Sequence, residues 1–245
     1  ARSGRMDSPM PIEAGCPMLI NADFEQIAIE HNKPESWVLS PSAGVTRRML
    51  DRVGGEVARA TSLVRYAPNS KFETHTHEMG EEYLVLDGSF LDEDGIHSAG
   101  TYVRNPPGSL HSPGSTFGCV IFVKLRQFRK DDQNYVNKIP EDQLWQRDEH
   151  SDCNKYKLLF EDPHELVRIE DWKAGYEANE YLPYGAELLV ISGCLTFNAA
   201  GMSEQLHPWS WLRLPAGATL ALGAEGQNAC IWIKRHLKPL DVGAN

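Results

Sequence analysis

Two closely spaced histidines and a nearby glutamate have the residue types and the spacing of a metal site. His75 and His77 are separated by one residue, so in a strand both imidazoles point to one face, with Cα atoms roughly 6.5–7 Å apart. Imidazole nitrogens bind divalent ions at about 2.0–2.1 Å, and Glu81 adds a carboxylate after a short turn. His111 is expected on a later strand that a Pro/Gly turn opens. The sequence therefore predicts one divalent metal ion bound by His75, His77, Glu81 and His111.

The residues that follow Glu81 are the next candidates for chemistry. Tyr83 shares the inward face of the strand with Glu81, and its hydroxyl could donate a proton or a hydrogen bond near the metal. A core tyrosine that bonds to the backbone explains this residue equally well. Glu82 faces the other way, so we expect it to pair with a basic residue or to support the site from outside the ligand set. No further catalytic carboxylate or histidine is evident from the sequence.

The elements that must position these residues are short strands. Long helical periodicity is nearly absent, and short runs of Val, Ile, Leu and aromatic residues alternate with turn residues, among them many of the 20 Gly and 15 Pro. This pattern predicts an all-β fold, a sandwich or barrel of antiparallel strands. With 245 residues the chain is long enough for two ordinary domains of roughly 100–150 residues each.

The two halves of the chain resemble each other in the order and spacing of their strands. Three blocks recur: Glu81–Gly88 as Ala186–Gly193, Arg104–Gly108 as Arg213–Gly217, and Ile121–Lys124 as Ile231–Lys234. The offset between the copies grows only from 105 to 110 residues, which favours duplication over chance similarity. We therefore expect a first domain over residues 25–130, a linker over 131–152 with one or two helical turns, and a second domain over 153–240.

The second copy has lost the residues that would bind metal. Alignment of the copies places Glu180, Leu182, Ala186 and Leu220 opposite His75, His77, Glu81 and His111. Without imidazoles the second domain is expected to hold no metal. Its leucines indicate either an apolar ligand pocket or a filled core that supports the first domain or an oligomer interface, and we favour the filled core.

The spacing of the candidate ligands matches the two cupin motifs. The first motif, Gly-x5-His-x-His-x3-Glu-x6-Gly, is met from Asn69 to Gly88, with Asn69 in place of the first glycine. The second motif, Gly-x5-Pro-x-Gly-x2-His-x3-Asn, is met from Gly100 to Ser115, with Ser115 in place of the asparagine. The chain thus resembles a bicupin, and this resemblance implies two tandem double-stranded β-helix (jelly-roll) barrels.

More narrowly, segments 80–90 and 99–111 resemble the cupin domain of the ChrR type, known from anti-sigma factors that respond to oxidative stress. They are also similar to the acetylacetone-cleaving dioxygenase, a small iron cupin. Both resemblances imply that the metal ligands are His75, His77, Glu81 and His111. ChrR proteins grip the sigma factor with a zinc-binding module that contains His-x3-Cys-x2-Cys. A sigma factor remains a candidate partner, although this sequence lacks that motif.

The number of ligands decides which chemistry the ion could support. Four protein ligands close a tetrahedral zinc site, which is structural or sensory. On octahedral Fe, Mn, Ni or Co they leave two positions for a bidentate substrate, or for substrate and dioxygen. Our first hypothesis is an iron-dependent dioxygenase that acts on a small diketone, thiol or enolisable carbonyl compound. A zinc-binding stress-responsive regulator is the second, and metal-independent binding of a sugar or other small molecule is the third.

Composition argues against several other classes of protein. The 34 acidic residues outnumber 24 basic ones, and the net charge of -10 disfavours binding to nucleic acid or to an anionic membrane. No apolar run approaches the roughly 18 residues of a membrane span. Five scattered cysteines without a Cys-x-x-Cys predict no disulfide framework and a reducing cytoplasm. The expected partners are a small-molecule ligand or substrate and, because cupins commonly pair through strands, a second copy in a homodimer.

The remaining candidates are interpreted as structural. The histidines at positions 31, 97, 150, 164, 207 and 236 stand beside turn residues and are expected in solvated loops. Arg104 could bind an anionic substrate, but its counterpart Arg213 lies in the copy without metal ligands, which favours a structural role. Cys119 could be redox-active near the metal or a small core residue, the commoner case. The tryptophans at 209, 211 and 232 are expected to pack the second domain.

Overall fold

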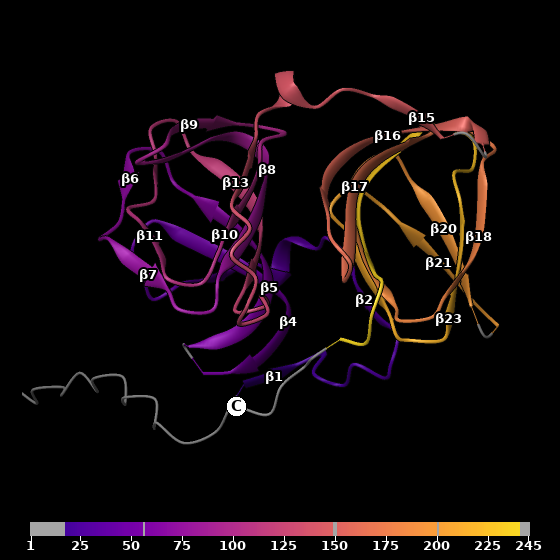
Figure 1. The fold of residues 1–245 in the computed structure, drawn as a ribbon, viewed down its shortest axis with the longest axis horizontal. Coiled ribbons are helices and arrows are strands. Elements are labelled where there is room, and N and C mark those ends of the chain that lie inside the picture. Colours follow the sequence, from indigo (N-terminus) through magenta and orange to yellow (C-terminus); the bar gives the residue numbers. More distant parts are fainter. Residues whose placement is uncertain (1–17, 56, 149–150, 200, 241–245) are drawn as a thin grey trace, which may run out of the picture.

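The computed structural model describes residues 18–55, 57–148, 151–199 and 201–240, and it shows two β-barrels side by side (Figure 1). The helices of the described residues are two 3-10 turns, η1 (Pro34–Ser36) and η2 (Pro140–Asp142), and the other elements are strands. The all-β class and the two-barrel arrangement expected from the motifs are therefore confirmed. The described part of the chain contains no helix with the length and apolarity needed to span a bilayer.

The first barrel is an antiparallel structure around one long sheet with the strand order β1-β4-β5-β13-β8-β10-β14. A separate two-stranded sheet, β11-β7, lies beside it, and β6, β9 and β12 pair around the end of β8. Its strands are β1 (Met18–Ile20), β3 (Val38–Leu39), β4 (Val45–Gly54), β5 (Ala58–Tyr66), β6 (Ser70–Lys71), β7 (His75–His77), β8 (Glu81–Asp92), β9 (Gly95–Ser98), β10 (Tyr102–Asn105), β11 (Ser109–His111), β12 (Gly114–Ser115), β13 (Cys119–Leu125) and β14 (Val136–Lys138).

The last glycine of the first motif lets β8 pass from one sheet of this barrel to the other. Before Gly88 the strand pairs with β13 and β10, and after it the strand pairs with β9 and β12. Gly88 has φ of +69°, and a Cβ at this position would lie 2.1 Å from the carbonyl oxygen of Gly118. Only glycine tolerates both conditions. The bend thus places the first residue of β8, Glu81, and its last residue, Asp92, in different sheets of the barrel.

The second barrel has a seven-stranded sheet, β15-β16-β17-β24-β19-β22-β2, and a four-stranded sheet, β18-β23-β20-β21. Its strands are β2 (Ala28–Glu30), β15 (Gln146–Asp148), β16 (Ser151–Glu161), β17 (Glu165–Trp172), β18 (Glu177–Leu182), β19 (Ala186–Ser192), β20 (Leu195–Ala199), β21 (Met202–Leu206), β22 (Trp211–Leu214), β23 (Ala218–Gly223) and β24 (Ala229–His236).

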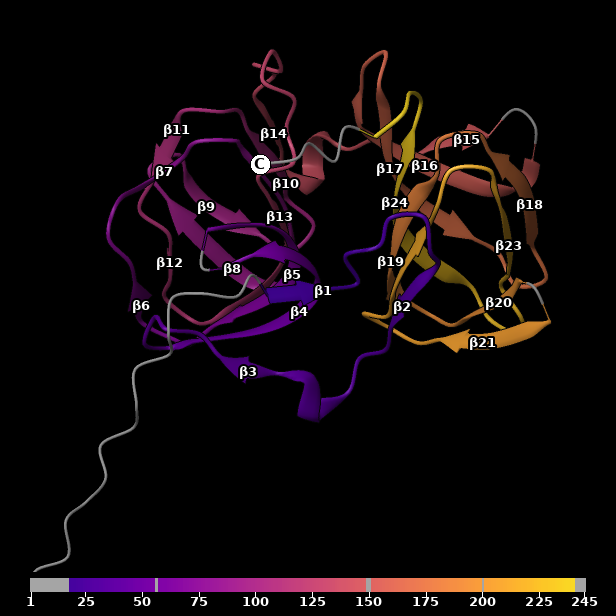
Figure 2. The ribbon, with the colours of Figure 1, turned by 90° about the horizontal axis from the view of Figure 1, so that it is seen from below.

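Each barrel has a short edge strand from outside its expected domain. β2 lies early in the chain yet pairs with β22 of the second barrel, and β14 follows the first barrel in sequence and pairs with β10. Figure 2 shows indigo β2 against the second barrel, whereas β1 lies against the first. The expected linker over 131–152 therefore contains β14, η2 and β15, and part of the expected first domain over 25–130 adds to the second sheet.

The interior of the second barrel contains the residues that stand in place of metal ligands. Leu182, Ala186 and Leu220 are at most 2% exposed and belong to one apolar cluster of this barrel. The carboxylate of Glu180 instead forms an ion pair with Arg235 at 3.0 Å. These four positions favour the filled core over an apolar ligand pocket.

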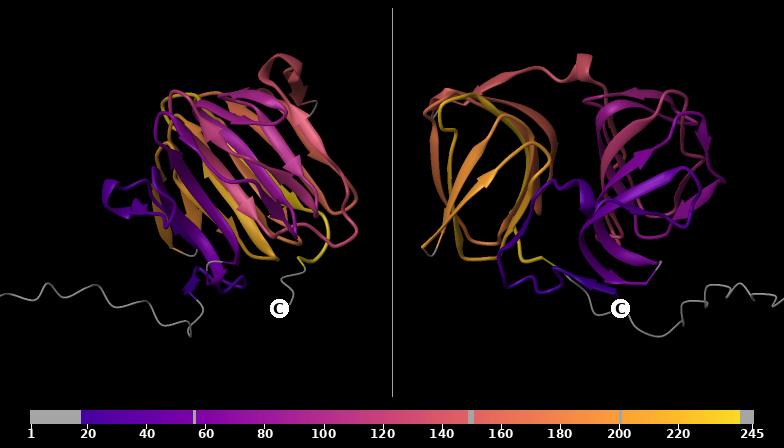
Figure 3. Two further views of the ribbon diagram at one scale, coloured as in Figure 1. Left: turned by 90° about the vertical axis from the view of Figure 1, so that its left-hand side faces the viewer. Right: turned by 180° about the vertical axis from the view of Figure 1, so that it is seen from behind.

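A second apolar cluster joins the facing sheets of the two barrels, whose strands run in similar directions (Figure 3). It combines Leu84 and Phe122 of the first barrel with Leu189, Trp211 and Trp232 of the second. The rings of Phe122 and Trp232 meet edge to face with centroids 4.9 Å apart. Trp211 and Trp232, expected to pack the second barrel, also hold the barrels together.

Buried ion pairs cross the same interface in a reciprocal pattern. Lys124 of the first barrel reaches Glu187 of the second at 2.6 Å, and Lys234 of the second reaches Glu82 of the first. These pairs connect equivalent residues of the duplicated blocks in exchanged order. The expectation that Glu82 pairs with a basic residue is confirmed, and its outward face is the barrel interface.

Arg104 belongs to this interface as well. Its guanidinium forms ion pairs with Asp132 and Glu165 and lies 3.8 Å from the ring centroid of Phe160. Arg213 makes the equivalent buried ion pair with Asp51 at 3.1 Å. The structural interpretation of both arginines is confirmed.

Candidate metal centre

Two short paired strands bring the three histidines together. In the antiparallel pair β7-β11, His111 lies opposite His75, and Ser109 lies opposite His77. Because alternate residues of a strand share a face, all three imidazoles project to the same side of this ribbon. The intervening Leu110 projects to the other side and is 60% exposed.

A tight turn returns Glu81 to the histidines. Gly80 precedes β8 with φ of +76°, and a Cβ there would lie 2.5 Å from the ring of Phe128. The backbone of Gly80 donates to the carbonyl of His77 at 3.2 Å, which closes the turn. The first motif therefore needs glycine at this position to place the carboxylate next to the imidazoles.

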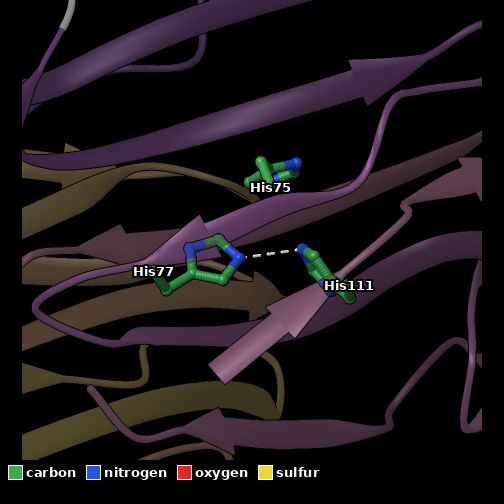
Figure 4. Close-up of side chains that lie close together, drawn as sticks. All are labelled: His75, His77 and His111. Carbon is green, nitrogen blue, oxygen red and sulfur yellow. Dashed lines mark hydrogen bonds between the residues drawn. The ribbon is translucent and has the colours of Figure 1, made fainter. Parts of the chain in front are cut away.

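The three imidazoles lie close together (Figure 4), and Glu81 lies beside two of them. One ligand nitrogen from each of His75, His77 and His111 lies within 4.8 Å of the other two. The Nε2 atoms of His77 and His111 are 2.9 Å apart, and the Oε2 atom of Glu81 is 3.4 and 3.5 Å from them. The four residues predicted as ligands are therefore neighbours in the fold.

The separations of these atoms match those of ligands around one ion. Two donors that are each about 2.05 Å from an ion lie about 2.9 Å apart at an angle of about 90° and about 3.4 Å apart at about 110°. The observed separations of 2.9, 3.4 and 3.5 Å have these values. Imidazole nitrogen and carboxylate oxygen are also donors that first-row divalent ions accept. The histidine cluster is therefore consistent with a metal site.

The site is buried on one side and open on the other. His77, Glu81 and His111 are between 5% and 8% exposed, whereas His75 is exposed. Burial lowers the pKa of His77 despite the nearby carboxylate of Glu81, which favours the neutral imidazole that binds metal. Burial also opposes charge on His111, but the carboxylates of Asp92 and Glu81 outweigh it and raise the pKa of that imidazole.

Asn105 is a supporting residue that the sequence reasoning missed. It lies opposite Glu81 in the β10-β8 register, and its Nδ2 donates to Oε2 of Glu81 at 3.2 Å. This is the carboxylate oxygen that faces His77 and His111. The side chain of Asn105 is 8% exposed, so the amide holds the carboxylate in place within the barrel. Its position just before the Pro-Pro-Gly of the second motif is the available sequence signal.

Replacing Asn105 by alanine is expected to weaken metal binding without removing a candidate ligand. Loss of a group that orients a ligand typically costs 10–100-fold in metal affinity, and we expect a fall of about 10-fold because a single neutral hydrogen bond is lost. Competition titration with a chromophoric chelator measures the change. Asn179→Ala, on exposed β18 of the second barrel, is the matched control, and equal affinities of the two variants would contradict the role of Asn105.

Tyr83 and His97 both contact Asp92 at the far end of β8. The Tyr83 hydroxyl donates to Oδ2 of Asp92 at 3.4 Å, and burial raises the pKa of this phenol, so it stays protonated. His97 was expected in a solvated loop, and this is wrong. It lies in β9, is 2% exposed, and its Nε2 is 2.7 Å from Oδ1 of Asp92. A lone histidine beside turn residues gave no sign of this contact.

The other expected residues lie away from the cluster or within the core. Burial raises the pKa of the Cys119 thiol to about 11, which fits a protonated core residue. Cys119, Cys194 and Cys230 are free thiols, while Cys16 and the side chain of Cys153 lie outside the described residues. His207 is exposed, and burial lowers the pKa of half-buried His236 in β24 to about 4. His31 pairs with Glu204 at 3.5 Å, and His150 lies outside the described residues.

The paired barrels and the histidine cluster in one of them define a two-barrel cupin. Residues 25–129 match the family model of the ChrR cupin-like domain. The match covers most of the first barrel and all four candidate ligands. No match was found among the curated proteins.

Solved structures share the fold of this chain at low sequence identity. The Escherichia coli protein YlbA is 14% identical with a TM-score of 0.69, over 94% of this chain and 97% of that chain. A Nostoc punctiforme protein provisionally described as a dioxygenase is 12% identical with a TM-score of 0.66, over 93% and 84%. A variant of salicylate 1,2-dioxygenase from Pseudoaminobacter salicylatoxidans is 11% identical with a TM-score of 0.56, over 72% and 70%.

Proposed function

We propose that this protein is a metal-dependent dioxygenase whose ion is held by His75, His77, Glu81 and His111. The substrate class is a small diketone, thiol or enolisable carbonyl compound, and the expected ion is ferrous iron, with Mn, Ni and Co as related candidates. The observation that carries the proposal is the cluster of three imidazoles, with the Glu81 carboxylate beside two of them, at a site that is open beside His75. When bound, such an ion supplies Lewis acidity and the redox chemistry of dioxygen.

The residues of the chain contribute binding, orientation and exclusion of water. Burial keeps His77 neutral and ready to bind, and Asn105 fixes the Glu81 carboxylate against the histidines. The buried side of the cluster excludes water, so substrate reaches the site on the exposed side of His75. Tyr83 acts at most through Asp92, to which it donates its hydrogen bond, and not as a direct proton donor.

Similarity to known proteins supports an oxygenase without identifying a substrate. Two of the structural relatives are described as dioxygenases, and both share the two-barrel fold with this chain. The free thiols at Cys119, Cys194 and Cys230 suit the reducing cytoplasm in which we place the protein. A homodimer of this chain remains part of the proposal.

A zinc-binding, stress-responsive regulator is the second candidate, because residues 25–129 match the ChrR cupin-like domain. Four ligands would close a tetrahedral zinc site and leave no position for substrate. The 3.4 and 3.5 Å separations of Glu81 from His77 and His111 suit tetrahedral angles. In this case the partner would be a protein, with a sigma factor as the first to test.

Metal analysis followed by oxygen uptake separates the two candidates. The protein is purified without oxygen, its metal content is measured, and the ferrous form is screened for oxygen consumption with β-diketones and thiols. We expect about one iron per chain and turnover that His75→Ala abolishes, while His207→Ala on the second barrel retains it. Tightly held zinc without turnover would favour the regulator. Failure to retain any transition ion would overturn both.

A further inference from the structure

Asp92 lies at the end of β8 opposite to Glu81 and contacts several polar groups from one buried carboxylate. Its Oδ1 accepts from Nε2 of His97 at 2.7 Å and from the backbone N–H of Asp94 at 2.9 Å. Its Oδ2 accepts from the Tyr83 hydroxyl at 3.4 Å and lies 3.7 Å from Nδ1 of His111. The carboxylate is 5% exposed. Asp92 therefore connects a candidate metal ligand to His97 and Tyr83, which are outside the ligand set.

The contact with Asp92 falls on the nitrogen of His111 that faces away from the metal site. The Nε2 atom of His111 points to His77 and Glu81, at 2.9 and 3.5 Å. Its Nδ1 atom is buried and has no hydrogen-bond partner among the described residues. The carboxylate of Asp92 at 3.7 Å is the ion-pair partner on this side. An imidazole that binds through Nε2 carries its proton on Nδ1, and a nearby carboxylate favours this tautomer.

His97 holds this carboxylate in a fixed position. β9 pairs with the end of β8, with His97 opposite Phe90 and Gly95 opposite Asp92. His97 is 2% exposed, and its ring lies against Tyr83 and Phe90 with centroids 6.1 and 6.3 Å away. The ring of Phe90 is in turn 5.9 Å from that of His111. The hairpin therefore sets the direction of the Asp92 carboxylate relative to His111.

His75 and His111 differ in the group that lies beside their Nδ1 atoms. The Nδ1 atom of His75 faces the backbone carbonyl of Glu73 at 3.1 Å, which is a neutral acceptor. The Nδ1 atom of His111 instead lies 3.7 Å from a carboxylate oxygen of Asp92. A charged partner strengthens the donor character of an imidazole more than a neutral carbonyl does. A carboxylate beside Nδ1 therefore favours the His111 tautomer whose Nε2 lone pair is free to bind a cation.

We infer that Asp92, held by His97, is a positioning residue that fixes His111 with its Nε2 lone pair directed into the metal site. The inference rests on the proposed metal site and adds to it a residue outside the ligand set. It also assigns the donor in the short contact between His77 and His111. If Nδ1 of His111 carries the proton, then Nε2 of His77 is the donor in the 2.9 Å contact between the two rings.

Metal titration of paired variants tests this role. Cobalt(II) is titrated into metal-free wild-type protein and into Asp92→Asn and Asp94→Asn, with the visible absorption of the bound ion as the signal. Asp92→Asn is expected to bind 10–100-fold more weakly, as is typical for the loss of such a partner, and to give a changed spectrum. Asp94→Asn, in the exposed turn two residues away, is expected to behave as wild type.

A second pair of variants and one measurement on wild-type protein still test the inference if Asp92→Asn does not fold. His97→Ala is expected to weaken cobalt binding, and His97→Gln, whose amide can still donate to Asp92, is expected to restore it. In metal-free wild-type protein at pH 8, nitrogen-15 NMR of the imidazoles is expected to show His111 protonated on Nδ1.

The outcomes separate this inference from the proposed function. Cobalt that fails to bind wild-type protein would overturn the metal site and the inference with it. Cobalt that binds wild type and Asp92→Asn equally would leave the metal site standing and overturn the inference. If Asp92→Asn does not fold, His111 protonated on Nε2 in wild-type protein, or His97→Gln binding no better than His97→Ala, would overturn it.

Discussion

His77→Ala lowers the affinity for a divalent ion by more than 100-fold, the upper end of the loss typical for residues that only support a ligand. The reason is that Nε2 of His77 lies 2.9 Å from that of His111 and 3.4 Å from the Glu81 carboxylate, so its removal takes a donor from the centre of the cluster. The expected order of losses is His77→Ala first, then Asp92→Asn, then Asn105→Ala. Competition titration with zinc or cobalt measures all three on one scale.

The same change removes the stabilisation that the ion gives to the fold. An ion at 1,000 times its dissociation constant stabilises the native state by about 4 kcal/mol, so wild-type protein is expected to unfold at a higher temperature with zinc than with a chelator. His77→Ala should show a much smaller difference between the two conditions, because a 100-fold weaker affinity leaves a stabilisation of at most about 1.4 kcal/mol at the same zinc concentration. His207→Ala, on an exposed position of the second barrel, should respond as wild type does. A full metal-induced shift in His77→Ala would show that the ion binds elsewhere.

Lys124→Met is expected to destabilise the whole chain by about 3–5 kcal/mol, the usual effect of removing one partner of a buried ion pair. The ammonium of Lys124 donates across the barrel interface to Glu187 at 2.6 Å, and within its own barrel to Thr61 at 3.2 Å. Both charged side chains are at most 2% exposed, so the variant leaves the Glu187 carboxylate buried without its closest cation. Urea denaturation followed by tryptophan fluorescence measures the loss.

An exposed ion pair and a double variant serve as controls for this effect. Arg126→Ala breaks a pair whose Glu78 side chain is 74% exposed, and should cost at most about 1 kcal/mol. Lys124→Met combined with Glu187→Leu should cost less than the sum of the two single changes, since no charge is left unpaired. A cost for Lys124→Met no larger than that for Arg126→Ala would show that the buried pair does not hold the barrels together.

The candidate ligands could be found from the sequence because their placement is local. Alternation along β7 puts His75 and His77 on one face, a glycine turn returns Glu81, and the second motif supplies His111 on the strand that pairs with β7. Each step depends on a few neighbouring residues, and each of these positions requires a particular residue type. The fold class followed in the same way from short strands and turn residues.

The supporting residues could not be found because they depend on strand register. Asp92 meets His97 only through the pairing of β8 with β9, and Asn105 meets Glu81 only through the pairing of β10 with β8. Neither register leaves a residue pattern that distinguishes it from a shift by two positions. Strand alternation did place Glu82 outside the barrel, but its partner Lys234 lies 152 residues further along the chain.

The short strands β2 and β14 could not be predicted for a related reason. β2 and β14 are three residues each, too short to show an alternating pattern, and each pairs with a strand far away in the sequence. The tryptophans of the second barrel were likewise assigned to its own interior, because composition does not reveal which face of a sheet meets a second sheet.

The pairing of β2 with β22 makes the second barrel depend on the leading part of the chain. A protease cut between the barrels would give a leading fragment that carries away the border strand of its neighbour's sheet. If that cut fell before Val136, the trailing fragment would likewise keep the strand that completes the sheet beside Arg104. The two pieces would therefore be expected to stay associated after cleavage and to recombine when mixed, while a barrel without its border strand would present a bare sheet edge and aggregate.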